Sequence, residues 1–262
     1  MPSVSDKKSA NINSIDRALN IMELLYHENR NMGVNEIASK LGDHQSTVHR
    51  CISTLKNRGY IYQDADSLKY GLDFKLYMLG KSVESNSVLI NKARKFAKEI
   101  ALEFQETVNV AIRDQAFPDD YKAITILQEK GGTRALNVTE SYGASYDCIT
   151  SAVGKALLAF SNDYDEDHMR RLTYPCYTSN TITNAEDYIK EIEEVRKNKY
   201  AVDNEEVAEG LYCIAVPVLK KNGEAIMAIS VSGYVGTISG IGKEIIIKRL
   251  RDACNEISRE IL

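Results

Sequence analysis

The chain has 262 residues, of which 44% are hydrophobic and 27% are charged. This length is more than one small core normally uses, so we expect two domains. No run of about eighteen apolar residues is present, which excludes a membrane-spanning helix. The N-terminal residues 1–13 are mostly polar and lack the apolar segment of a signal peptide. We therefore expect a cytoplasmic protein with no membrane partner.

The net charge of −4 is unevenly distributed along the chain. Residues 1–80 contain ten Lys/Arg and nine Asp/Glu, whereas the remainder contains twenty-three and twenty-eight. No acidic residue lies between His44 and Gln63, a stretch that includes Arg50, Lys56 and Arg58. A local basic surface on an otherwise acidic protein is typical of a small DNA-binding module.

The five cysteines and four histidines form no recognisable catalytic or metal-binding pattern. The cysteines lack metal-ligand spacing, so we expect thiols, most of them buried, and no metal. A Gly-Ile-Gly-Lys stretch resembles half of a P-loop, but Thr237 and Glu244 replace the glycine and the Ser/Thr that this loop requires. We interpret Glu205 and Glu206 beside Asp203 as a polar pocket rim rather than an acid/base pair. We therefore expect no cofactor and no enzyme activity.

Three helices are predicted near the N-terminus from the spacing of apolar side chains. The first begins at Ser14, which we expect to be its N-cap. The second covers residues 35–41, and Gly42 is a typical stop signal after it. The third covers about residues 44–57.

The third predicted helix has two chemically different faces when its residues are placed at 100° steps. Its apolar face consists of Val48, Cys51, Ile52 and Leu55. Its opposite face carries hydroxyl, imidazole, guanidinium and amide groups from Ser46, His49, Arg50, Ser53 and Asn57. Such groups suit base edges and phosphates, and arginine can bind guanine through two hydrogen bonds. The alternative is an amphipathic helix whose polar face is simply solvated.

A β-hairpin is predicted directly after this helix, with strands at 60–63 and 69–72. A hairpin in this position is a wing, and Lys69 on it can reach the DNA backbone. The ordered set of a short helix, a Gly-containing turn, a polar-faced helix and a hairpin predicts a winged helix-turn-helix over residues 1–73.

In these residues the sequence resembles the IclR family of bacterial regulators. The resemblance is carried by Ser14-Ile15-Asp16-Arg17-Ala18-Leu19, Ser46-Thr47-Val48-His49-Arg50, Thr54-Leu55, Arg58-Gly59-Tyr60, Lys69-Tyr70 and Leu79-Gly80. It implies that operator DNA is faced by Gln45, Ser46, Thr47, His49 and Arg50. We expect Arg17, Ser53 and Lys69 to complete the DNA-binding set.

The remaining sequence predicts a helical linker over residues 74–87 and an effector-binding domain over 88–262. A long amphipathic helix is expected at 88–105. Further strands are expected at 107–112, 123–128, 134–138, 211–219 and 225–232, and further helices at 151–160, 185–198 and 240–262. Strands grouped together with flanking helices, rather than strict alternation, predict an α+β domain with a largely antiparallel sheet.

The resemblance continues over nearly the whole chain. It is carried by Gly154-Lys155-Ala156-Leu157-Leu158-Ala159, Tyr200-Ala201-Val202-Asp203, Glu205-Glu206, Gly210-Leu211, Cys213-Ile214-Ala215-Val216-Pro217-Val218 and Ser230-Val231-Ser232-Gly233. It implies that the second domain is a GAF-like effector domain.

Strand alternation predicts where a ligand binds to this domain. Ser230 and Ser232 share one face of their strand, and small residues of the 211–219 strand leave room above the sheet. The alternative is that the serines face water on a one-sided sheet. The helix that begins at Ser151 has a positive end, whose free N–H groups suit a carboxylate and belong to Ala152, Val153 and Gly154.

The family resemblance places an effector pocket on the same elements. It implies contacts from the backbone N–H groups of Ala152 and Val153. It further implies side-chain contacts from Asp203, Leu211, Cys213, Ser230 and Ser232. Tyr146 lies where some members have an aliphatic residue, and its phenol would either fill the pocket or hydrogen-bond the ligand.

The sequence therefore predicts a transcription regulator whose partners are double-stranded operator DNA and a small-molecule effector, with a small organic acid expected. The alternative is a GAF-like sensor that signals through protein contacts and uses its helix-turn-helix only to dimerise. One winged-helix unit reads few base pairs, so we expect at least a homodimer. The resemblance suggests dimers that pair again into tetramers.

Overall fold

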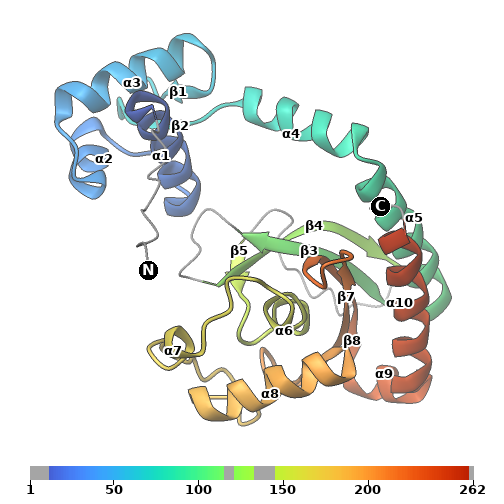
Figure 1. The fold of residues 1–262 in the computed structure, drawn as a ribbon. Coiled ribbons are helices and arrows are strands. Elements are labelled where there is room, and N and C mark those ends of the chain that lie inside the picture. Colours follow the sequence, from blue (N-terminus) through green and yellow to red (C-terminus); the bar gives the residue numbers. More distant parts are fainter. Residues whose placement is uncertain (1–11, 115–120, 133–144, 260–262) are drawn as a thin grey trace, which may run out of the picture. The chain divides into compact units, whose positions relative to one another are not determined.

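The computed structural model describes residues 12–114, 121–132 and 145–259. The chain divides into two compact units, Met1–Asn86 and Ser87–Leu262, which are described in turn (Figure 1). Over the described residues, no helix has both the length and the apolar character needed to cross a membrane.

The first unit is a winged helix-turn-helix, as the sequence predicts. Its elements are α1 (Asn13–Glu28), α2 (Val34–Leu41), α3 (Gln45–Asn57), the antiparallel strands β1 (Ile61–Gln63) and β2 (Tyr70–Leu72), and α4 (Phe74–Asn86). The apolar sides of the first three helices meet in a core that includes Ile21, Ile37 and Ile52. The hairpin joins this core through Ile61 and Tyr70.

One helix start differs from that expected. Ser14 lies inside α1, which follows Ile12 and has no side-chain cap. α3 begins after His44, as expected, and His44 occupies the N-cap position without a capping hydrogen bond. The predicted stop after α2 is confirmed, because Gly42 has a φ of +66° in the left-handed region that glycine favours.

α4 has no buried residue along its length. The apolar side chains that it exposes are Phe74, Tyr77, Met78, Leu79 and Val83. A helix of thirteen residues is only marginally stable without packing against another element. The exposed apolar side of α4 is therefore a candidate contact with another chain.

The second unit is an α+β domain with an antiparallel sheet, as predicted. Its six strands have the order β5-β4-β3-β8-β7-β6. The strands are β3 (Thr107–Asp114), β4 (Lys122–Lys130), β5 (Ser145–Asp147), β6 (Ala201–Asn204), β7 (Leu211–Leu219) and β8 (Ala225–Tyr234). The helices are α5 (Val88–Phe104), α6 (Ala152–Ala159), α7 (Glu166–Met169), α8 (Ala185–Asn198), α9 (Val235–Ile241) and α10 (Lys243–Ser258).

Some elements of this unit were not predicted. β5, β6 and α7 have only three or four residues each, which is too short for periodicity to identify. The helix expected at 240–262 corresponds to α10, which begins only after Gly242 with its φ of +99°, and the preceding α9 was not predicted. Residues 260–262 of that expected helix lie outside the described residues. The strand expected at 134–138 lies outside the described residues.

Helices cover both faces of the sheet (Figure 1). On one face, Val108, Ile214 and Ile229 pack with α5 and α10 in a single apolar core. On the other face, α6 packs over small side chains, which include Ala111, Ala123, Ala215 and Ala228, and α8 packs against α6. α6 also packs closely against the chain after β5. At Gly154 the two segments are so close that a Cβ atom there would collide with the backbone of Cys148.

Lys155, in the first turn of α6, is a fully buried cation. Its Nζ lies 2.5 Å from Glu206 Oε1 and 3.5 Å from Glu191 Oε1, and it donates to Val202 O at 3.0 Å. Burial raises the pKa of the Glu206 carboxyl, and the nearby Lys155 opposes this shift. These contacts tie α6 to strand β6 and to the turn that follows it.

Replacing Lys155 by Met should destabilise the protein by about 3–5 kcal/mol near neutral pH, because Glu206 is left buried without its counter-charge. Without Lys155 the pKa of Glu206 rises further, so the folded state holds a proton that the unfolded state releases. The loss should be small near the ordinary carboxyl pKa of about 4.3 and should grow as the pH rises.

Urea unfolding of wild type and K155M between about pH 5 and about pH 8 measures this loss. The control K155M/E206M removes both charges and should recover most of the stability. A loss that does not change with pH would contradict the assignment of the effect to the Glu206 carboxylate.

Candidate DNA-binding and effector-binding sites

α3 presents the polar face that the sequence predicts. Its buried side is formed by Val48, Ile52 and Leu55. Its exposed residues include Gln45, Ser46, His49 and Arg50. α3 is the second helix of the helix-turn-helix, which is the helix that enters the major groove in proteins with this motif.

Three other residues of the expected DNA-binding set are partly engaged within the protein. Thr47 and Ser53 are half-buried, and Ser53 Oγ donates to His49 O at 2.8 Å. Arg17 forms an ion pair, with its Nε 3.1 Å from Asp43 Oδ1 in the turn before α3. Arg17 therefore fixes this turn, and a contact between Arg17 and DNA stays a prediction.

The wing is held firmly against the end of α3. Lys56 Nζ donates to Gln63 Oε1 at 2.8 Å, which ties the helix to β1. The turn of the hairpin is closed by a hydrogen bond from Asp64 N to Lys69 O at 2.8 Å. Lys69 is exposed, as expected for a wing residue that reaches the DNA backbone.

The two serines expected to bind an effector lie on the side of the sheet that faces α6. The register of β7 and β8 pairs Ser232 with Cys213 and Ser230 with Ala215, so these side chains share a face. Ser230 and Ser232 are only 2% and 3% exposed. The alternative in which the serines face water is therefore wrong, because helices cover this face as well.

The first turn of α6 supplies two of the three expected N–H groups. Ser151 is the N-cap, and its Oγ accepts a hydrogen bond from Gly154 N at 3.1 Å. The N–H group of Gly154 is therefore engaged by the cap, which corrects the expectation that it is free. The N–H groups of Ala152 and Val153 precede the first hydrogen bond within the helix.

Four of the expected effector residues belong to one buried cluster on the α6 side of the sheet, namely Ala152, Val153, Leu211 and Cys213. Asp203, 1% exposed, pairs with Cys213 in the register of β6 and β7. Its Oδ1 accepts a hydrogen bond from Glu206 N at 2.7 Å, so the turn after β6 fixes its carboxylate. Glu206, which we expected at a pocket rim, is instead the buried partner of Lys155.

Three polar residues that the sequence analysis missed extend this face. Asn109 on β3 lies between Ser230 and Gln128 in the sheet, and Thr125 lies opposite Ala111. Gln128 Nε2 donates to Asn109 Oδ1 at 3.0 Å, and Asn109 Nδ2 donates to Ser232 Oγ at 3.4 Å. The available signal was alternation in β3, where polar residues at 107 and 109 alternate with valines at 108 and 110.

These polar residues lie on the α6 side of the sheet along neighbouring strands, with Cys213 between Ser232 and Asp203 and with Thr125 in register with Ala111. We call this group the polar band and define it as Thr125, Gln128, Asn109, Ser230, Ser232 and Asp203. Tyr146 on β5 lies at its end and is half-buried, with its OH 3.2 Å from Thr125 Oγ1.

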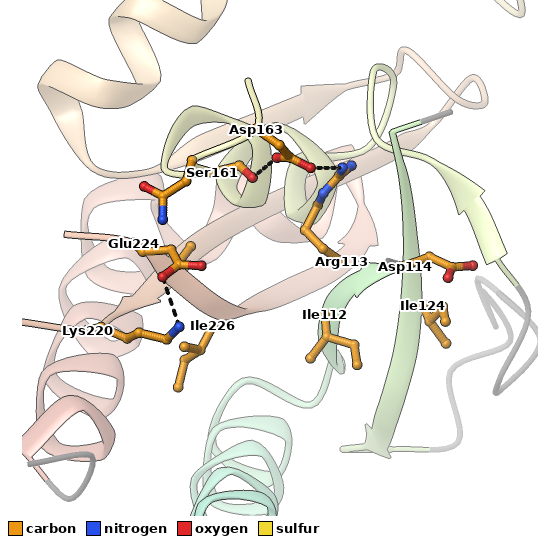
Figure 2. Close-up of a pocket in the computed structure, with 11 residues that line it drawn as sticks. Ile112, Arg113, Asp114, Ile124, Ser161, Asp163, Lys220, Glu224 and Ile226 are labelled. Carbon is orange, nitrogen blue, oxygen red and sulfur yellow. Dashed lines mark hydrogen bonds and ion pairs between the residues drawn. The ribbon is translucent and has the colours of Figure 1, made fainter. Parts of the chain in front are cut away.

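A separate cavity of about 770 Å³ lies at the opposite end of β3 and β8 (Figure 2). Its apolar wall consists of Ile112, Ile124 and Ile226. Four of its charged groups form two ion pairs, with Arg113 Nη2 3.1 Å from Asp163 Oδ2 and Lys220 Nζ 2.9 Å from Glu224 Oε2. Asp114 also lines the cavity.

The other groups that could carry chemistry are metal ligands and cysteine thiols. Within the described ranges, no group of three or more His, Cys, Asp or Glu side chains could hold a metal ion. All five cysteines are free thiols, and three of them are buried: Cys148, Cys213 and Cys254. Burial raises the pKa of Cys148 to about 12, so this thiol stays protonated at neutral pH.

Comparison with known proteins accounts for both units. The model of the IclR helix-turn-helix domain matches residues 14–65, and the model of the bacterial transcriptional regulator IclR C-terminal domain matches residues 81–259. The HTH-type transcriptional regulator KdgR of Escherichia coli is 31% identical over 231 residues, which cover 87% of this chain and 84% of the relative.

Solved structures agree with these matches. An IclR transcriptional regulator from Alicyclobacillus acidocaldarius has a TM-score of 0.77 and 25% identity, covering 96% of this chain and 100% of that one. An IclR homologue from Microbacterium hydrocarbonoxydans, complexed with 4-hydroxybenzoate, has a TM-score of 0.71 and 17% identity, covering 95% and 98%. The chain therefore belongs to the IclR family and is a DNA-binding transcriptional regulator.

Proposed function

We propose that this regulator binds a small organic acid at the polar band and that binding changes its affinity for operator DNA. The observation that carries the proposal is the burial of Ser230, Ser232 and Asp203 on the face covered by α6. Buried polar groups are costly unless they are hydrogen-bonded. A helix N-terminus attracts a carboxylate, and α6 begins on this face of the sheet.

The proposed effector is bound without turnover, so the acid should be recovered unchanged. Its carboxylate would accept hydrogen bonds from Ala152 N and Val153 N, and the hydroxyls of Ser230 and Ser232 would contact the rest of the molecule. The Microbacterium hydrocarbonoxydans homologue, whose complex contains 4-hydroxybenzoate, also holds a carboxylic acid.

We further propose that the functional unit is at least a homodimer. One winged-helix unit contacts only a few base pairs, so two units are needed for useful affinity. The exposed apolar residues of α4 support this proposal, since Leu79 and Val83 are both exposed and lie four residues apart on one helical stripe. An effector that favours one arrangement of the two units would then change DNA affinity by shifting a population.

Replacing Arg50 by Ala should weaken binding to operator DNA roughly tenfold or more, because one charge-assisted contact is lost from the exposed face of α3. A gel shift with DNA from upstream of the gene measures this affinity at fixed salt. The control K98A removes one exposed positive charge from α5 and should bind like the wild type. Equal affinity of R50A and wild type would remove Arg50 from the interface.

Replacing Ser232 by Ala should weaken acid binding by about tenfold, because it removes one buried hydroxyl partner. Isothermal titration of candidate organic acids against both proteins measures the change, and a gel shift should find operator affinity unaltered. An acid that binds both proteins equally well would contradict the assignment of Ser232 to the effector site.

Replacing Leu79 by Glu should shift the protein from dimer to monomer, because a charge cannot be buried cheaply in an apolar helix contact. Light scattering after size exclusion gives the mass in solution. T183E introduces the same charge at an exposed loop position of the second unit and should stay dimeric. A wild-type protein that is monomeric at all concentrations would overturn the dimer proposal.

A further inference from the structure

The wing of the first unit is a small hairpin whose position depends on contacts outside the hairpin itself. Its strands β1 and β2 have three residues each, and a two-stranded hairpin is only marginally stable by itself. Two of its residues, Ile61 and Tyr70, belong to the buried core of the first unit. The direction in which the turn between the strands points is therefore set by the polar contacts around it.

The turn between α1 and α2 adds a third strand position beside β2. Met32 N donates to Tyr70 O at 2.9 Å, and Tyr70 N donates to Met32 O at 2.8 Å. Met32 itself is fully buried. This pair of hydrogen bonds brings the preceding residue, Asn31, to the surface of the hairpin.

The side chain of Tyr62 reaches across the hairpin to Asn31. Asn31 Nδ2 donates to Tyr62 OH at 3.0 Å, and Tyr62 OH donates to Asn31 Oδ1 at 3.2 Å. Gly71 lies opposite Tyr62 in the register of the two strands. A Cβ atom at Gly71 would lie 2.8 Å from the Tyr62 ring and would also collide with Asn31 Oδ1. Glycine at this position therefore leaves the space that the contact between Tyr62 and Asn31 needs.

The neighbouring residue of β1 holds the hairpin to a different element. Successive side chains of a strand point to opposite faces, so Gln63 points away from Tyr62. Gln63 Oε1 accepts a hydrogen bond from Lys56 Nζ of α3, and Gln63 Nε2 donates to Leu68 O at 3.1 Å. The hairpin is thus tied to the turn before α2 on one face and to α3 on the other.

The turn of the hairpin is ordered by its own side chains. Asp64 Oδ1 accepts hydrogen bonds from Ser67 N at 2.8 Å and from Ser67 Oγ at 2.6 Å. These bonds lower the pKa of the Asp64 carboxyl, so the turn stays closed at neutral pH. Because the turn is closed in this way, Lys69 at its end moves with the strands, and the orientation of the hairpin decides where the Lys69 ammonium lies.

We propose that Asn31, Tyr62 and Gly71 are positioning residues for DNA binding, and we call them the wing anchor. The anchor holds the wing so that Lys69 meets the DNA backbone while α3 occupies the groove. Contacts to phosphate fix the register of a protein on the duplex, and a contact that is already oriented avoids the cost of ordering it on binding. The proposal depends on DNA binding by the first unit and on the predicted Lys69 contact, and it is independent of the acid effector.

A role in stability alone is the alternative. The side chain of Tyr62 is 38% exposed, and an exposed hydrogen bond exchanges with water and contributes little to the free energy of unfolding. The core residues Ile61, Tyr70 and Met32 are buried without help from Tyr62. We therefore expect Y62F to unfold in urea at nearly the same midpoint as the wild type.

The test is a double-mutant cycle with the full chain and upstream DNA, with affinity measured by fluorescence anisotropy at several salt concentrations. In the wild-type background, K69A should weaken binding roughly tenfold and lower the slope of log affinity against log salt by about one, because one phosphate contact is lost. In the Y62F background, K69A should weaken binding less than about threefold and leave the slope nearly unchanged, because Lys69 is no longer held at the phosphate.

Two further variants separate the wing anchor from a direct contact between Tyr62 and DNA. N31A removes the partner of the Tyr62 hydroxyl, and G71A keeps every polar group but pushes the ring and the amide apart. Both should reduce the effect of K69A as Y62F does. The control Y177F removes an exposed hydroxyl in the second unit and should leave the effect of K69A at its wild-type value.

Three results would overturn the proposal. An equal loss from K69A in the wild-type and Y62F backgrounds would show that the anchor does not position Lys69. Weaker binding by Y62F with unaltered binding by N31A and G71A would assign the Tyr62 hydroxyl to the DNA itself. If K69A binds like the wild type, the wing makes no contact for the anchor to position, whereas the role of α3 is judged separately by R50A.

Discussion

The sheet of the second unit is covered by helices on both faces, and this constraint decides the chemistry of every side chain on it. α5 and α10 bury one face completely in an apolar core. On the other face, small apolar side chains pack with α6, and polar side chains on the same face also stay buried. Because burial makes each of these polar groups expensive unless it is hydrogen-bonded, their concentration on one face supports the proposed ligand site.

Three residues at the start of α6 fix the position of this helix on the sheet, each in a different way. Ser151 caps the helix, Gly154 allows close packing on Cys148, and Lys155 binds the turn after β6 through Glu206. Glu206 N also donates a hydrogen bond to the Asp203 carboxylate, so a chain of contacts connects Lys155 of α6 to Asp203 of the polar band. The first turn of α6 and the polar band are thus parts of one connected structure.

The sequence was sufficient for the features that depend on periodicity and ordered motifs. The polar face of α3, the wing and the long strands β7 and β8 follow from apolar spacing, and the structure agrees with them. The burial of Ser230 and Ser232 could not be predicted, because alternation shows which residues share a face but not whether a helix covers it. Asn109 and Gln128 were missed for a related reason, since only the strand order 4-3-8 brings them beside the serines.

The same limit applies to charged groups. Lys155 occupies a position in α6 that, from sequence, is as compatible with solvent as with a core, and its partner Glu206 lies 51 residues away. The sequence predicts Glu206 at the rim of a pocket, whereas the turn after β6 buries its side chain in the protein. Gly154 was expected to offer a free N–H group, which the neighbouring Ser151 side chain takes instead.

In the proposed function, acid binding in the second unit is coupled to DNA binding in the first. Coupling between two sites is reciprocal, so operator DNA must change the acid affinity by the same factor by which the acid changes DNA affinity. The most direct test is isothermal titration of the tightest-binding acid into the free protein and into its saturated complex with upstream DNA. We predict two different affinities, whose ratio equals the shift in DNA affinity seen in a gel with and without the acid. The same acid affinity in the presence and absence of DNA would contradict the proposed coupling between the two binding sites.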